Sequence, residues 1–285
     1  MKIAVTGATG HLGQLAIMGL VEKHPANDII AVVRDAKKAG ELAARGVDVR
    51  VANYEDPDAL QKALAGVDSL LLVSSSEVGK RFVQHRNAID AAKATGVRRI
   101  VYTSAPKATT STLILAPEHK ATEEYIAQSG MTYTIVRNNW YTENYTQLIE
   151  TARNTGVVVA AAGKGRVASA SRADFAAGAV AVLLGQGHDG KIYEFGGDYA
   201  WNYDELAAAI GGIIGKPVAY KPVDAQSLIG ILKGVGLDEG TAGFVAALDS
   251  NIADGVLAEV TGQLSELIRR PTTPLKVGLK NALSQ

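Results

Sequence analysis

Apolar segments of strand length alternate with amphipathic segments of helix length from Lys2 to about Arg137. This alternation is typical of right-handed βαβ units, which build a parallel sheet with helices on both faces. The pattern predicts sheet strands at Ile3–Thr6, Ile29–Val33, Asp48–Ala52, Ser69–Val73, Ile100–Thr103 and Tyr133–Val136. Helices are predicted between them at Leu12–Lys23, Lys37–Ala44, Pro57–Leu64, Val78–Ala94 and Pro117–Gln128. The sequence therefore predicts an α/β fold on a Rossmann-like, doubly wound parallel sheet.

The regular rhythm loosens after residue 137. Further strands are predicted at Val157–Ala161, Ile192–Phe195 and Val218–Lys221, and further helices at Tyr203–Ile214 and Ala225–Leu232. We expect residues 1–137 to form the Rossmann domain and residues 138–285 a smaller C-terminal α/β lobe. At least one segment, Ile192–Phe195, is expected to return from this lobe to the main sheet.

Three glycines follow the first strand at a spacing of three residues: Gly7, Gly10 and Gly13. A strand that turns directly into a helix aims backbone N–H groups and the positive end of the helix dipole at one point. Gly7 would make the turn, Gly10 would lie against a phosphate and Gly13 would let the helix pack closely. The pattern predicts a dinucleotide pyrophosphate site, and the alternative is a glycine-rich turn that binds nothing.

Composition narrows the classes of protein to consider. The 29 basic and 29 acidic residues balance to a net charge of +0, which gives no support to a nucleic-acid or membrane-surface partner. The chain has no cysteine, and its five histidines lack metal-site spacing, so we expect no metal. Neither a secretion leader nor an apolar run of about 18 residues is present, which predicts a soluble cytoplasmic protein.

Arg34 ends the second strand, where many dinucleotide-binding domains carry an acidic residue that binds the ribose 2′-hydroxyl. A guanidinium at this place suits a 2′-phosphate instead, which predicts NADPH rather than NADH as the cofactor. The alternative is a solvated arginine that pairs with Asp35. By position after their strands, Asn53 and Tyr54 would border the adenine, and Ser74–Ser76 the ribose and pyrophosphate, unless this serine loop is only a polar connection.

Three segments together resemble a known family: Thr6–Gly13, Ser74–Gly79 and Arg137–Tyr145. They are similar to the NmrA-like group of atypical short-chain dehydrogenases. Within that group the chain is most similar to the bacterial NADPH:quinone oxidoreductases of type 2, with the triphenylmethane-dye reductases as near relatives. The resemblance extends over essentially the whole chain, including Ala168–Asp174 and Pro271–Leu275.

The resemblance implies a flavin-free enzyme that passes hydride from NADPH to a quinone. The cofactor-binding residues that it implies are Gly7, Thr9, Gly10, His11, Leu12, Arg34, Ser74, Ser75, Ser76, Asn138, Trp140, Tyr141, Thr142 and Glu143. One departure is Asn53, which stands where relatives usually carry aspartate and leaves the adenine contact open.

The residues for proton transfer are less clear. Ordinary short-chain dehydrogenases use a Tyr-x-x-x-Lys pair, and the matching positions here hold His119 and Glu123, one helical turn apart. His119 is either a proton donor or quinone contact, or a polar residue of a helix first turn whose charged form the dipole disfavours. Asn138 would hydrogen-bond the quinone or the nicotinamide, and Tyr141 with Trp140 would form a flat wall or pack as core. The catalytic candidates are therefore Asn138, His119 and Tyr141.

Quinone reduction needs mainly positioning, because a conjugated quinone accepts hydride readily. Two rivals remain: a related reductase that acts on a dye, an enone or another aromatic substrate, and a non-catalytic NADP(H)-sensing regulatory protein. The expected partner is a small-molecule quinone. The sequence leaves the oligomeric state open, with a homodimer as one alternative.

Overall fold

In the computed structural model, which describes residues 1–284, the chain folds into two compact units. The first unit comprises residues 1–109, 115–138 and 172–195, and the second comprises residues 110–114, 139–171 and 196–284 of the described chain. The first unit thus includes one helix and one strand, within residues 172–195, that lie beyond the predicted boundary at residue 137. Among residues 1–284 no helix is long and apolar enough to cross a membrane.

The first unit is built on a seven-stranded sheet in the order β3-β2-β1-β4-β5-β6-β9, with every pair parallel. Its strands are β1 (Ile3–Val5), β2 (Ile29–Val33), β3 (Asp48–Val51), β4 (Ser69–Leu72), β5 (Arg99–Ser104), β6 (Thr132–Asn138) and β9 (Ile192–Phe195). Ile3 is in register with Ile29 of β2 and with Ser69 of β4, so the strand order reverses at β1. A doubly wound sheet binds ligands outside the carboxyl ends of its strands at such a reversal.

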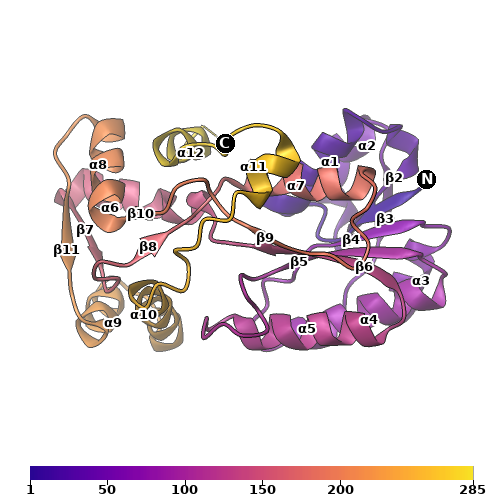
Figure 1. Cartoon of the computed structure of the whole chain (residues 1–285), viewed down its shortest axis with the longest axis horizontal. Helices are drawn as coiled ribbons and strands as arrows, with labels where there is room; N and C mark the ends of the chain where they lie inside the picture. The colour runs from indigo at the N-terminus through magenta and orange to yellow at the C-terminus, as the bar shows by residue number, and fades with distance from the viewer. Residues whose placement is uncertain (285) are drawn as a thin grey trace. The chain divides into compact units, whose positions relative to one another are not determined.

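Helices cover both faces of this sheet (Figure 1), with α1, α2 and α7 on one face and α3, α4 and α5 on the other. Their bounds are α1 (His11–Val21), α2 (Gly40–Ala44), α3 (Pro57–Leu64), α4 (Arg81–Ala94), α5 (Ala116–Gln128) and α7 (Arg172–Leu184), with short 3₁₀ turns η1 (Ala26–Asp28) and η2 (Ala36–Ala39). The core under α3, α4 and α5 is apolar, with Leu64, Leu70, Ile89 and Ile100 fully buried. Burial of such side chains is the main stabilising contribution to this unit.

The predicted α/β fold and parallel sheet are confirmed. Local chemistry explains why α3 begins where predicted: the Asp56 side chain accepts from the Ala59 N–H at 3.0 Å, and Pro57 occupies the first turn. The prediction of one helix over Lys37–Ala44 is wrong at its start. Asp35 accepts from the Lys37 N–H at 2.9 Å and begins the 3₁₀ turn η2, which precedes α2.

The predicted start of α4 at Val78 is also wrong, because α4 begins three residues later, at Arg81. Gly79 has a φ of 86°, in the left-handed region that a right-handed helix cannot include. The segment from Ser74 to Lys80 is therefore a loop at the carboxyl edge of the sheet rather than a helical first turn.

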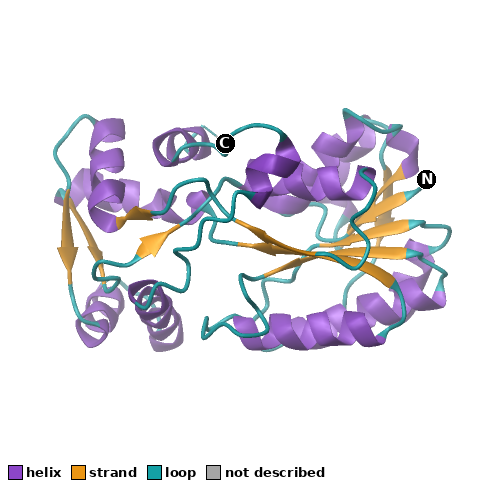
Figure 2. Ribbon diagram, in the orientation of Figure 1, coloured by secondary structure: helices purple, strands orange, loops and turns teal. Residues whose placement is uncertain are grey.

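The second unit contains two small sheets, β7 (Val157–Ala160) parallel to β11 (Ala219–Pro222), and β8 (Arg166–Val167) antiparallel to β10 (Trp201–Asn202) (Figure 2). Its helices are η3 (Thr142–Tyr145), α6 (Thr146–Thr155), α8 (Tyr203–Ile214), α9 (Ala225–Gly234), α10 (Glu239–Ala253), α11 (Gln263–Ile268) and α12 (Leu275–Ala282). The bounds of α8 match the prediction, and a capping box between Asn202 and Glu205 fixes its start. The sequence pattern did not predict β8, β10, α6, α10, α11 or α12.

Candidate functional site

The glycine turn between β1 and α1 lies at the point where the strand order reverses. Gly7 has a φ of 59°, which an L side chain rarely adopts, and α1 begins directly after Gly10 with no side-chain cap. A Cβ on Gly13 would lie 2.3 Å from the Gly7 carbonyl oxygen, whereas one on Gly10 would lie 3.2 Å from it. Gly13 is therefore the glycine that the close packing of α1 on the turn requires, and the exposed Gly10 leaves the helix N-terminus accessible.

The other residues of this turn differ in exposure. Thr9 is partly exposed and His11 is exposed, so both side chains can reach a ligand at the start of α1. Leu12 is buried in the core, so it can contribute only its backbone N–H to a phosphate. The turn thus offers mainly backbone donors, as a pyrophosphate site requires.

Arg34 follows β2, next to the glycine turn in the sheet order. Its side chain is 69% exposed, and Nη1 lies 3.1 Å from Oε1 of Glu77 in the loop after β4. The structure pairs Arg34 with Glu77, whereas the Asp35 side chain accepts from the Lys37 N–H and caps η2. An exposed guanidinium at this edge is accessible to an anion, and its ion pair with the partly exposed Glu77 is itself open to solvent.

Asn53 and Tyr54 follow β3 and differ in exposure and in their hydrogen bonds. Asn53 is exposed, and its side-chain oxygen accepts from the Glu55 N–H at 3.4 Å. The Tyr54 hydroxyl donates to the carbonyl of Val73 at 3.0 Å, and burial raises the pKa of this phenol to about 12. Tyr54 therefore ties the end of β3 to the end of β4, and only Asn53 is free of the core.

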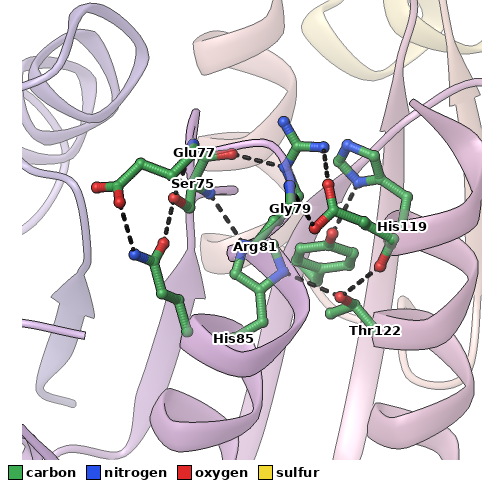
Figure 3. A network of polar contacts seen from close by, with 10 residues as sticks. Ser75, Glu77, Gly79, Arg81, His85, His119 and Thr122 are labelled. Atoms are coloured by element: carbon green, nitrogen blue, oxygen red, sulfur yellow. Dashed lines mark hydrogen bonds and ion pairs between the residues drawn. The ribbon is translucent and has the colours of Figure 1, made fainter. Parts of the chain in front are cut away.

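The serine loop after β4 is held by a network of polar contacts (Figure 3). The Ser75 N–H donates to Nε2 of His85 at 2.9 Å, its hydroxyl donates to Oε1 of Gln84, and its carbonyl accepts from Nε of Arg81 at 2.7 Å. The Ser74 N–H donates to the Thr103 hydroxyl on β5 at 2.9 Å. Because Ser75 is held on three sides by α4, the loop has a fixed shape at the carboxyl edge, with Ser76 exposed beside it.

His85 connects this loop to α5. Its Nε2 accepts the Ser75 N–H, so the proton of the neutral ring lies on Nδ1, which donates to the Thr122 hydroxyl at 3.0 Å. Thr122 in turn donates to the Glu118 carbonyl at 2.8 Å. Burial, followed by the charge of Arg81, lowers the pKa of His85 to about 3. His85 is therefore a neutral structural link at physiological pH.

His119 lies in the same network, on α5, and is only 5% exposed. Its Nδ1 is 2.7 Å from the hydroxyl of Tyr102, which leaves Nε2, the other ring nitrogen, without a role in that hydrogen bond. Figure 3 shows His119 beside the network of Arg81 and Thr122. Burial first, then the charge of Arg81 and the electrostatic effect of His85, lower the pKa of His119 well below its ordinary value. The main cause of the lowered pKa of His119 is thus desolvation, whereas the sequence had suggested the helix dipole.

Glu123 does not take the place of the missing lysine as a partner of His119. Its carboxylate accepts two bonds from Arg137, from Nε at 2.9 Å and from Nη2 at 2.6 Å, and one from the Ser104 hydroxyl at 2.6 Å. Arg137 also donates to Glu194 of β9 at 2.8 Å. Burial opposes the charge of Arg137, but the hydrogen bonds that it donates to Glu123 and Glu194 raise its pKa. This buried clamp joins α5, β5, β6 and β9 just before Asn138, the last residue of β6.

The remaining site candidates belong to the second unit. Trp140, Tyr141 and Glu143 are partly exposed. The Thr142 hydroxyl is buried 2.9 Å from the Ser169 hydroxyl, and its N–H donates to the Ala170 carbonyl at 3.0 Å. Thr142 is therefore part of the packing of this unit, and its side chain is committed to Ser169.

The structure brings together residues that the sequence pattern did not connect. Arg81, His85 and Tyr102 surround the predicted His119, and Glu77 faces the predicted Arg34. The spacing of Arg81 and His85, four apart on one helix, is a weak indication that they share a face. Within residues 1–284, no group of three or more His, Asp or Glu side chains could hold a metal ion.

Comparison with known proteins places this arrangement among nucleotide-dependent enzymes. Residues 7–185 match the profile of a family described as NAD(P)H-binding. The chain is 49% identical to quinone oxidoreductase 2 of Escherichia coli, over 96% of each chain. The crystal structure of the NADPH-dependent quinone oxidoreductase from that organism in complex with NADPH superposes with a TM-score of 0.95, at 48% identity over 99% of both chains. The triphenylmethane reductase of Citrobacter sp. complexed with NADP(H) superposes with a TM-score of 0.94, at 39% identity over 99% of this chain and 100% of that one.

Proposed function

This chain belongs to the NAD(P)H-binding family, and from that premise we propose that it is an NADPH-dependent oxidoreductase that reduces quinones without a flavin. The observation that carries the proposal is the 49% identity, over 96% of both chains, to quinone oxidoreductase 2 of Escherichia coli. The sequence resemblance to the type 2 quinone oxidoreductases within the NmrA-like group points to the same activity.

The residues at the carboxyl edge of the first sheet fit the cofactor. The glycine turn has the positive φ at Gly7 and the close approach at Gly13 that a pyrophosphate cradle requires, and α1 begins there without a side-chain cap. Arg34 presents an exposed guanidinium for a 2′-phosphate. We propose that these residues, with Thr9, His11 and the loop Ser74–Ser76, hold NADPH.

Bound NADPH would supply the hydride that reduces the quinone ring. The contribution of the protein is then to orient the two rings and to exclude water, because proximity alone is worth about 7–11 kcal/mol in the best cases. We propose that Asn138 and His119 donate hydrogen bonds to a carbonyl oxygen, and that Trp140 and Tyr141 contact flat rings. We propose that Glu143 also contacts the cofactor, and that Thr142 serves the cofactor site by holding this segment in place through its bonds to Ser169 and Ala170.

His119 would act as a neutral donor. When the Tyr102 hydroxyl donates to Nδ1, the single proton of the neutral ring lies on Nε2, the nitrogen that does not face this hydroxyl. Such a ring stabilises developing negative charge by a hydrogen bond without giving up its proton, as neutral imidazoles do elsewhere. Water can then protonate the product after the hydride has moved.

Reduction of a triphenylmethane dye is the second candidate activity, favoured by the superposition on the Citrobacter reductase with a TM-score of 0.94. The test is NADPH oxidation followed at its absorbance maximum with p-benzoquinone, with malachite green or with no acceptor. We expect rapid, stoichiometric oxidation with the quinone. Oxidation with the dye alone would favour the second activity, and NADPH binding with neither acceptor reduced would identify a sensor and overturn the proposal. A cytoplasmic location and a homodimer remain predictions.

A further inference from the structure

Glu77 places a carboxylate at the edge where Arg34 presents its guanidinium. Its Oε1 is 3.1 Å from Nη1 of Arg34, and its side chain is 40% exposed. Its Oε2 accepts from Nε2 of Gln84 at 3.1 Å, and its backbone N–H donates to the Ser75 hydroxyl at 3.2 Å. Figure 3 shows Glu77 and Ser75 beside one another in the loop after β4.

Gln84 makes this carboxylate different from an ordinary surface glutamate. Gln84 is only 2% exposed, and its Oε1 accepts from the Ser75 hydroxyl while its Nε2 donates to Glu77. A buried amide whose two ends are both engaged cannot turn away from the carboxylate without losing a hydrogen bond. Glu77 is therefore held in place opposite Arg34, so less side-chain entropy opposes the ion pair than in a fully mobile pair.

From this geometry we infer that Glu77 is a specificity-determining residue that limits the preference for NADPH over NADH. The inference rests on the proposed function, in which Arg34 binds the 2′-phosphate. A phosphate that approaches Arg34 must displace the Glu77 carboxylate or share the guanidinium with it, and two anions at one cation repel each other. The 2′-hydroxyl of NADH meets no such repulsion, because a carboxylate accepts its hydrogen bond.

The test is the substitution Glu77→Gln, which removes the charge and keeps an amide oxygen that can accept from Gln84. We expect the dissociation constant of NADPH to fall about three- to tenfold, and that of NADH to stay constant or rise. Both constants are measured by isothermal titration calorimetry at low and at moderate salt. The gain for NADPH should shrink as salt increases, because exposed charges are screened.

Glu55→Gln is the matched control. Glu55 lies after β3, and its exposed carboxylate forms an ion pair with Lys80 at 3.5 Å. This variant changes the net charge by the same amount and leaves the Arg34–Glu77 pair intact. We expect it to change the affinities for NADPH and NADH by similar, small factors.

A third variant, Arg34→Ala, distinguishes failure of this inference from failure of the proposed 2′-phosphate site. If Arg34→Ala weakens NADPH selectively but Glu77→Gln does not raise the NADPH to NADH affinity ratio above that of Glu55→Gln, this inference is overturned and the 2′-phosphate site stands. Weaker NADPH binding in Glu77→Gln would overturn it as well, since Glu77 would then serve to orient Arg34. If Arg34→Ala weakens both cofactors equally, the proposed 2′-phosphate site itself is wrong.

Discussion

At the scale of single residues, the chemistry of this protein depends on which charged groups stay exposed and which are buried. Arg34 keeps its guanidinium largely in solvent at the nucleotide edge. His119 is buried against Tyr102 and Arg81, and its charged form is disfavoured. The first arrangement suits recognition of an anion, and the second suits hydrogen bonding without proton transfer.

Arg34→Ala should weaken NADPH binding by about 1.5–3 kcal/mol, the usual contribution of a hydrogen bond to a charged group, and leave NADH binding nearly unchanged. Calorimetric titration of both cofactors measures the difference. Equal losses for the two cofactors would contradict the assignment.

His119→Ala should slow hydride transfer by less than about tenfold, whereas the loss of a general acid typically costs 10²–10⁴-fold. The pKa of His119 lies well below its ordinary value, so the wild-type rate should be flat between about pH 5.5 and 8.5. Single-turnover NADPH oxidation across this range measures both effects. A hundredfold drop together with the loss of a limb near the ordinary histidine pKa would show that His119 donates a proton.

At the scale of elements, two close contacts hold the site in shape. One is the packing of α1 on the glycine turn at Gly13, where the backbone leaves no room for a side chain. The other is the clamp of Arg137 between Glu123 and Glu194, which joins α5 to β6 and β9. Gly13 follows the proposed pyrophosphate turn, and Arg137 directly precedes Asn138, which is proposed to contact the quinone or the nicotinamide. A substitution at either contact should therefore alter ligand binding by shifting these neighbouring residues.

Gly13→Ala should destabilise the fold by about 1–3 kcal/mol, as overpacking does, and weaken NADPH binding, because its Cβ would lie 2.3 Å from the Gly7 carbonyl oxygen. Gly19→Ala is the matched control on the same helix, since its Cβ would lie 3.4 Å from a Val180 methyl group. Urea unfolding and cofactor titration compare the two. Equal behaviour of the variants would contradict the steric argument.

Glu123→Gln should lower the free energy of unfolding by about 3–5 kcal/mol, since it leaves the buried Arg137 short of one carboxylate. Glu124→Gln, one position along α5, removes an exposed carboxylate paired with Lys120 at 3.9 Å and should cost less than about 1 kcal/mol. Urea denaturation at neutral pH measures both values. A loss for Glu123→Gln no larger than that of the control would mean that the clamp adds little to stability.

At the scale of the whole molecule, the buried histidines link stability to pH. The folded-state pKa of His85 is lowered to about 3, and that of His119 is lowered in the same direction, whereas both titrate near their ordinary value in the unfolded chain. Between these limits the unfolded state binds more protons than the folded state. The stability that the neutral histidines contribute is therefore fully present above about pH 6.5 and is lost as pH falls toward the folded-state pKa.

Urea unfolding between about pH 4.5 and 8 should show this loss as a slope of about 1.4 kcal/mol per pH unit for each such histidine on the acid side. His85→Gln should reduce the slope, because an amide can replace both hydrogen bonds without titrating. An unchanged slope in His85→Gln would contradict the assignment.

The sequence by itself determined the α/β class, the parallel sheet, the glycine turn at Gly7 and the place of Arg34 at the end of β2. These features depend on neighbours along the chain, because strand and helix periods and turn chemistry are local. Which side chains contact Arg34 and His119 was decided only by the tertiary structure. Glu77 lies 43 positions from Arg34, and His119 meets Tyr102 17 positions away. Strand order decides which loops meet at the carboxyl edge, and burial decides which groups keep their charge, so neither can be read from spacing along the chain.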